Sequence, residues 1–409
     1  MVLQTSSLLG APVDDILSQG GDGDREPSPW PRRLALIGVL VLAVAGGVVY
    51  LALPRHQHSP AAAVPAPTGL AAPALPAEPD GIGGPTLPWA AGLRLPAAGT
   101  RPAWFSPATG RSAPIGGLPA DSSGYQFIRT DHGWVVQPNS AGKTAHDDYA
   151  VPPLPVWFLA DGAVSVTRVG TANQVAPAAT AGALWLTSYP LGADANSAAG
   201  TAREVSLAGA PLGAPVRLPP GYVIDQATDR GLLLAPAVPQ QGTTADKLWD
   251  AAAPRDSRTF DAVIAATPTE IAWAPACAAR CLVRVLDLAT GRQTAVELPR
   301  GSSAASGAFS PTGGFLALQL SLDNTGDDGA LAMQLEVASV TSGRLTAVPG
   351  TFVSSDALVG FGWPAASDSL VAEFIFTTKT QLASWQPGAS RLAVTVIPPG
   401  PDQAALVVG

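Results

Sequence analysis

Few residues of this chain could carry out acid–base or nucleophilic chemistry. Two of its four histidines, His132 and His146, fall in the C-terminal region that we expect to fold. His146 is followed by Asp147 and Asp148, and a carboxylate beside an imidazole can orient it as a base or help to hold a cation. Both histidines stand in segments typical of solvated turns, and the G-x-S-x-G motif of serine hydrolases does not occur. We therefore predict no catalytic residue.

Three segments have some features of a ligand site, but a solvated or non-binding role is favoured for each. AGKTAH (141–146) contains Gly-Lys-Thr, yet Gln137 stands where a phosphate-binding loop has its first glycine. DNTGDDG (323–329) offers carboxylate oxygens for Ca²⁺, but its glycine is displaced and no Glu closes the loop. His56 and His58 lie in a proline-rich stretch, which favours solvated linker residues. The sequence therefore predicts no metal site and no cofactor.

Cys277 and Cys281 are the two cysteines of the chain, separated by three residues between apolar runs. In an oxidising compartment this spacing favours a disulfide that clamps a turn, with two structural thiols as the alternative. A zinc site would need further ligands, and none lies nearby in the sequence. Because the closed loop is so short, the bond stabilises the fold by only about 2 kcal/mol.

A run of twenty residues without charge, Leu34 to Leu53, sets the expected location of the chain. As a helix it would span roughly 30 Å, the thickness of a bilayer's hydrocarbon core. Arg32 and Arg33 precede it, whereas Arg55 alone follows closely, so the N-terminus is expected in the cytoplasm and the C-terminal region outside. A cleaved signal peptide and a buried core helix are the alternatives, but the leader is long and the run is apolar all round.

This run divides the chain into four parts. We expect a disordered cytoplasmic tail at 1–33, a transmembrane helix at 34–53, a Pro/Ala-rich linker at 54–88 and an extracytoplasmic domain at 89–409. Charged residues make up only 13%, and Gly (43) and Pro (41) are abundant, which indicates many turns and short strands. From residue 90 onward, 19 Lys and Arg stand against 24 Asp and Glu, a net charge of −5. This mildly acidic balance and the lack of basic clusters argue against nucleic acid and against an anionic membrane surface as partners.

The C-terminal domain contains a recurring apolar segment that ends near a turn of small residues. Successive copies start 50, 48, 39, 45 and 54 residues apart, the length that a four-stranded propeller blade needs. The copies are GWVVQP (133–138), ALWLTS (183–188), GLLLAP (231–236), EIAWAP (270–275), FLALQL (315–320) and SLVAEF (369–374).

Hairpin patterns follow these segments, as in VRVLDLATGRQTAVELP (283–299) and LEVASVTSGRLTAVP (335–349). An additional hairpin at 103–119 has no partner before it, and AALVVG (404–409) supplies one more apolar strand at the C-terminus. The pattern predicts an all-β propeller of seven blades, the last of which is closed by strands from both ends of the chain. Six or eight blades, and a chain of two-sheet sandwiches, are the alternatives.

Three short motifs resemble those of known propellers. AFSPTGGFLAL (308–318) resembles the F-S-P-D-G element of TolB-like and WD-repeat propellers, with Thr312 in place of Asp. KLWD (247–250) resembles the strand-ending Trp-Asp of WD repeats, and LDLATGR (286–292) resembles their outer hairpin. The resemblance, which is to a divergent TolB-like or WD-repeat-like propeller, implies a rigid scaffold with loops on two faces that commonly binds partners.

Tryptophans occur in both the inner segments and the outer hairpins, where large rings would fill the wedge between blades. They are Trp134, Trp185, Trp273 and Trp363 in or beside the inner segments, and Trp104, Trp157 and Trp385 in the hairpins.

Taken together, these features predict a single-pass membrane protein whose exported propeller binds a protein or cell-envelope component without chemistry. An envelope hydrolase or lyase with its site in the central channel is the alternative. The sequence does not identify a ligand-binding residue.

Overall fold

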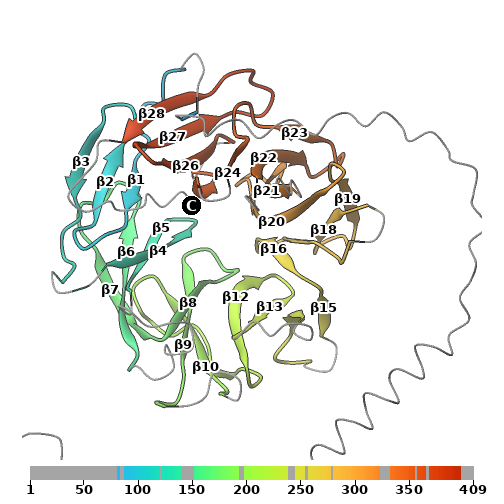
Figure 1. Ribbon diagram of the computed structural model, residues 1–409. Coiled ribbons are helices and arrows are strands. Elements are labelled where there is room, and N and C mark those ends of the chain that lie inside the picture. Colours follow the sequence, from blue (N-terminus) through green and yellow to red (C-terminus); the bar gives the residue numbers. More distant parts are fainter. Residues whose placement is uncertain are drawn as a thin grey trace, which may run out of the picture. The chain divides into compact units, whose positions relative to one another are not determined.

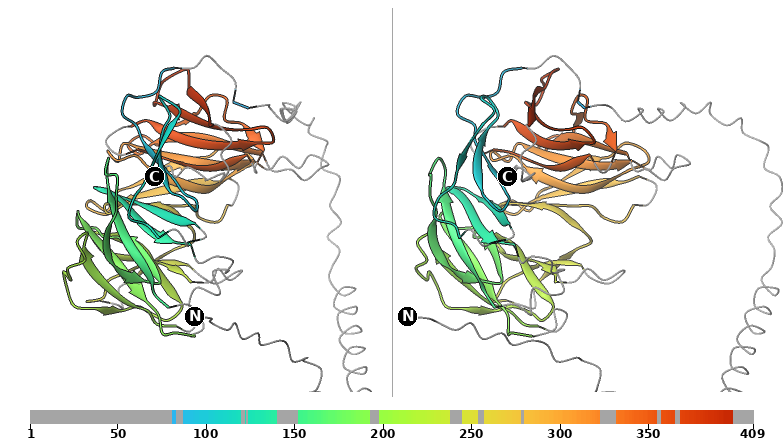
Figure 2. Two further views of the ribbon diagram at one scale, coloured as in Figure 1. Left: turned by 90° about the vertical axis from the view of Figure 1, so that its left-hand side faces the viewer. Right: turned by 60° about the vertical axis from the view of Figure 1, so that its left-hand side comes forward.

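The computed structural model of the protein describes residues 81–82, 87–119, 122, 124–139, 152–192, 198–237, 245–253, 257–277, 280–322, 332–354, 357–364 and 368–397. These residues form seven antiparallel sheets arranged around a centre, which we number as blades I to VII (Figure 1). Figure 2 shows the same ring turned toward its side. The prediction of a seven-bladed propeller is confirmed, and six blades, eight blades and stacked sandwiches are wrong.

The first three blades come from residues 95–217. Blade I contains β1 (Leu95–Ala97), β2 (Ala103–Ser106) and β3 (Arg111–Pro114). Blade II contains β4 (Tyr125–Thr130), β5 (Gly133–Pro138), β6 (Leu154–Ala160) and β7 (Thr167–Ala172). Blade III contains β8 (Gln174–Pro177), β9 (Ala183–Ser188), β10 (Thr201–Ser206) and β11 (Val216–Arg217).

The other four blades follow in sequence order. Blade IV contains β12 (Tyr222–Thr228), β13 (Gly231–Pro236), β14 (Asp246–Trp249) and β15 (Arg258–Phe260). Blade V contains β16 (Val263–Ala266), β17 (Glu270–Trp273), β18 (Leu282–Asp287) and β19 (Gln293–Glu297). Blade VI contains β20 (Ser302–Phe309), β21 (Phe315–Leu322), β22 (Ala332–Ser339), β23 (Leu345–Ala347) and β24 (Val353–Ser354). Blade VII contains β25 (Leu358–Gly362), β26 (Leu370–Phe376), β27 (Lys379–Trp385) and β28 (Ala393–Ile397).

The recurring apolar segments of the sequence are the second strands of blades II to VII: β5, β9, β13, β17, β21 and β26. These strands are apolar almost throughout because each blade packs against a neighbour on both of its faces. In β5, Trp134 joins a cluster with Trp104 of blade I, whereas the adjacent Val135 joins one with Leu184 of blade III. The core of the ring is therefore the series of wedges between blades.

Blade I has three strands in the described part of the chain. Leu95 of β1 and Phe105 of β2 share a cluster with Val371 and Leu382, which lie on the second and third strands of blade VII. β1 and β2 thus occupy the second and third positions of their blade. The predicted closing strand at 404–409 lies outside the described residues.

The predicted transmembrane helix at 34–53 and the tail at 1–33 also lie outside the described residues. Among the residues that the structure does describe, no helix is long and apolar enough to cross a membrane.

Candidate functional site

The antiparallel order gives the ring two different faces. Two kinds of connection leave from one face of the ring, which we name the loop face. One kind joins the second strand of a blade to its third strand, and the other links one blade to the next. Several of them are long, namely 139–153, 189–200, 237–245 and 323–331. The remaining connections leave from the opposite face, the turn face, where residues 131–132 and 229–230 alone join the first two strands of blades II and IV. Binding residues concentrate on long connections held by a rigid scaffold.

On the turn face, hydrogen bonds fasten neighbouring blades to one another. A backbone N–H or a hydroxyl of one turn donates to a carboxylate or carbonyl of the next turn. The pairs are Gly182 N–H to Asp131 (3.2 Å), Asp229 N–H to Pro268 O (2.8 Å) and Thr312 Oγ1 to Asp368 (2.7 Å). These groups are used within the fold, so the turn face is primarily structural.

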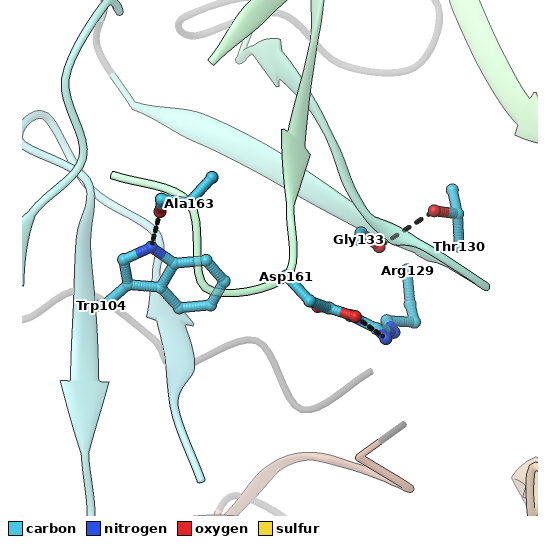
Figure 3. Close-up of polar contacts among 6 residues, drawn as sticks. All are labelled: Trp104, Arg129, Thr130, Gly133, Asp161 and Ala163. Carbon is cyan, nitrogen blue, oxygen red and sulfur yellow. Dashed lines mark hydrogen bonds and ion pairs between the residues drawn. The ribbon is translucent and has the colours of Figure 1, made fainter. Parts of the chain in front are cut away.

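Arg129 of β4 is held on the same face by a forked ion pair (Figure 3). Its guanidinium donates to both carboxylate oxygens of Asp161, at 2.6 and 2.8 Å, and lies 5.0 Å from the ring centroid of Trp134. Nearby, Trp104 Nε1 donates to the carbonyl of Ala163 at 2.7 Å, which ties blade I to blade II. Arg129 therefore has its charge compensated and its surface covered.

The first strands of blades II to VII are β4, β8, β12, β16, β20 and β25. In Figure 1, β4, β8, β12, β16 and β20 lie around the centre of the ring. In the described residues these strands carry two charged side chains, Arg129 and Asp225. Small or apolar residues make up most of the rest, for example VIAA in β16 and SSAASGAF in β20. Because Arg129 is paired with Asp161, Asp225 is the one charge on these strands without an opposite charge in ion-pair contact in the described structure.

β-Bulges occur in the first strands of four consecutive blades. The registers of β12, β16, β20 and β25 each shift by one residue against the second strand of the blade. The additional residues are Asp225, Ile264, Ala305 and Val359, and three of them are exposed. Bulges bend the strand and redirect a side chain. Asp225, Ala305 and Val359 are the exposed bulge residues, whereas Ile264 packs against the apolar cluster of blades V and VI.

Asp225 lies near a second carboxylate, Asp246, which begins β14 at the loop face. Burial and the charge of Asp246 raise the pKa of Asp225 above its usual value. Burial also raises the pKa of Asp246, partly offset because its Oδ2 accepts a hydrogen bond from Val263 N–H at 2.6 Å.

Lys247, the neighbour of Asp246, points to the opposite side of the sheet. Its ammonium lies 4.5 Å from the ring centroid of Tyr222, which accepts the cation on its π face. Tyr189 of blade III donates from its hydroxyl to Gln174 Oε1 at 3.1 Å and contacts the Tyr222 carbonyl at 3.4 Å. A polar band thus runs along the loop-face ends of blades III and IV.

Sequence reasoning did not find Asp225 and Asp246, although a lone Asp within the apolar strand YVIDQAT is unusual enough to be noticed. Only the fold shows that a residue 21 positions later lies near it. No group of three or more His, Cys, Asp or Glu side chains suited to a metal ion occurs among the described residues.

The other predicted residues are distributed as follows. His132 lies in the turn between β4 and β5, 3.3 Å from Asp131, and is well exposed. Cys277 and Cys281 are joined by a disulfide in the structure, with Cα atoms 4.7 Å apart, on the loop face between β17 and β18. Their oxidation in the cell stays a prediction. His146, the histidines at 56 and 58, and segments 141–146 and 323–329 lie outside the described residues.

The tryptophans are packing residues, as the sequence indicated. Those expected in the inner segments and hairpins are buried, with Trp185 partly exposed. Phe260 and Trp273 meet edge to face with centroids 5.2 Å apart between blades IV and V. Their position accounts for their size without a stacked ligand.

No protein-family model matches the sequence, and no curated protein matches it. Similar solved structures include TolB from Acinetobacter baumannii (11% identity, TM-score 0.39, 66% of this chain and 78% of that chain). They also include a Lactobacillus plantarum protein (13%, 0.43, 74% and 95%) and the acylaminoacyl peptidase of Pyrococcus horikoshii (10%, 0.44, 74% and 53%). The chain spans about half the length of the peptidase.

Proposed function

We propose that this protein is a membrane-anchored, extracytoplasmic propeller that binds a protein or cell-envelope component through its loop face, without catalysis. The observation that carries the proposal is the small number of charged side chains on the first strands of the blades in the described structure. A catalytic channel needs several convergent acid, base or cationic groups, and here a single uncompensated carboxylate stands among small and apolar residues. A rigid wall of this kind suits recognition of a surface or an extended segment.

The loop face supports the same proposal. Leu191, in the connection after β9, is 71% exposed, and an apolar side chain displayed on a long connection is a typical anchor for a protein partner. The turn face, in contrast, uses its polar groups to join blades. The TolB-like and WD-repeat-like motifs remain a resemblance that is consistent with a binding role.

Affinity capture with matched variants tests this proposal. The full chain is compared with Leu191→Asp on the loop face and Val164→Asp on the turn face, where Val164 is 68% exposed. Both substitutions place a carboxylate at an exposed apolar position, so their effects on folding should match. We expect Leu191→Asp to lose a partner that Val164→Asp retains. Equal capture by both variants, with unchanged partners, would argue against binding through the loop face.

The membrane anchor at 34–53 and the external location are tested separately. Protease added to intact cells should remove residues beyond the predicted helix and leave a short protected N-terminal fragment. A full-length chain that survives protease until the cells are lysed would contradict this location.

The enzymatic alternative is supported by one observation, the Asp225–Asp246 pair. A carboxyl group whose pKa is raised is suited to act as a general acid. A screen of ester and glycoside substrates would favour this alternative if turnover appeared and was lost in Asp225→Asn.

A further inference from the structure

Residues 81–82, which the sequence places in the linker, are built into the ring. The Ile82 side chain is 6% exposed and belongs to the apolar cluster between blades VI and VII, together with Leu335 and Phe374. Its backbone N–H donates to Gln381 Oε1 at 2.7 Å, a buried hydrogen bond that joins residues 299 positions apart. Gln381 is itself only 5% exposed.

Gly81 fits this place because it has no side chain. Its φ is +129°, a conformation that L residues with a Cβ rarely adopt. A Cβ there would also overlap Gln381 Oε1 and the Cε of Lys379. The space between blades VI and VII therefore favours glycine at position 81 and an aliphatic side chain at position 82. Gln381 binds the backbone N–H of residue 82.

The contact lies close to the loop face. β27 begins at that face with Lys379, and Gln381 is two residues further along the strand. A second contact, Leu87 N–H to the Leu392 carbonyl at 3.0 Å, lies at the other end of blade VII, just before β28. These two hydrogen bonds, at opposite ends of blade VII, show that the chain contacts this blade before it enters β1.

We propose that the seam between blades VI and VII is a socket for an extended peptide of glycine–aliphatic sequence, which Gly81–Ile82 fills in cis. The socket fastens the N-terminal part of the chain beside the loop face. This inference does not depend on the proposed binding function. It follows that a partner on the loop face would meet the ring on the side where the chain arrives.

The test uses the full chain and two variants of the socket's occupant, Gly81→Ala and Ile82→Asp. Each should lower Tm by on the order of 5 °C and speed protease cleavage before residue 87 by about tenfold or more. Leu87→Asp is the control, because Leu87 is 40% exposed and its contact is made by the backbone, so its Tm should match that of the wild type. The proposal would be overturned if both socket variants had the Tm and the protease cleavage rate of the wild type.

A peptide in trans tests recognition itself. PDGIGGP, the sequence of residues 79–85, should raise the Tm of Ile82→Asp at millimolar concentration, and the same peptide with alanine in place of the first glycine should not. Absence of any gain from PDGIGGP would overturn the proposal of a socket. Occupation by a second copy of the chain, seen as a dimer that Ile82→Asp dissociates, would overturn the assignment in cis.

Discussion

Replacement of Arg129 by alanine should destabilise the ring far more than the loss of an ordinary surface arginine. The Arg129 side chain is 16% exposed, its fork holds both oxygens of Asp161, and its guanidinium covers the buried Trp134. Hydrogen bonds to a charged partner contribute about 1.5–3 kcal/mol, and a cation–π contact adds about 0.5–1 kcal/mol. Asp161 is half exposed, so water screens the pair. We therefore expect a loss of about 2–3 kcal/mol in total.

Arg280 provides a matched comparison. It also pairs with a carboxylate, Glu297, but the two side chains are 74% and 57% exposed. Pairs of this kind contribute about 0.2–1 kcal/mol. At roughly 2 °C per kcal/mol for a domain of this size, Arg129→Ala should lower Tm by about 4–6 °C and Arg280→Ala by less than about 2 °C.

Differential scanning calorimetry at low and high salt measures both shifts, and an Arg129/Asp161 double-mutant cycle isolates the coupling between the two groups. The coupling should exceed about 1 kcal/mol and persist in part at high salt, because Arg129 is largely shielded from water. A loss for Arg280→Ala equal to that for Arg129→Ala would refute the argument from burial and fork geometry.

Three further predictions follow from individual residues. The raised pKa of Asp225 means that the folded state binds its proton more tightly than the unfolded state, so this group's contribution to stability grows as pH falls through the folded pKa. Asp225→Asn should therefore raise Tm at pH 7, and the gain should shrink toward pH 4. As the control, Asp261→Asn at an exposed position should leave Tm unchanged at both pH values. The double variant Cys277→Ser/Cys281→Ser should lower the free energy of unfolding by only about 2 kcal/mol. Peptide mapping of the wild type without reductant should recover the two cysteines linked, and separate thiols would contradict the pairing. Gly133→Ala should lower the free energy of unfolding by at least about 2 kcal/mol, because the φ of Gly133 is +155° and a Cβ would overlap the Leu159 carbonyl. Gly162→Ala, with open space around it, should lower it by about 1 kcal/mol. Similar unfolding free energies for the two variants would show that the close approach at Gly133 has no effect.

The blade number could be predicted from the sequence because the second strands are buried on both faces. Burial of this kind leaves continuous apolar runs such as GLLLAP, which recur at the length of a blade. The first strands were harder to recognise, since residues that face the centre are small or polar, as in SSAASGAF, and show no clear alternation. Their positions depend on the ring rather than on local pattern.

The candidate site depended still more on tertiary structure. Asp225 and Asp246 are brought together by strand order within blade IV, and neither stands in a motif. Ile82 falls within the predicted linker, where Gly and Pro surround it, and its role depends on Gln381 near the other end of the chain. Contacts between residues so distant in the sequence leave no periodic signal.

Photocrosslinking in living cells tests the central claim most directly. A photoreactive amino acid replaces Leu191 on the loop face or Val164 on the turn face of the full chain, and adducts are identified after irradiation. The account predicts a specific adduct with an envelope component or extracytoplasmic protein from position 191 and none from position 164. Adducts from position 164 alone, or with cytoplasmic proteins from either position, would contradict it.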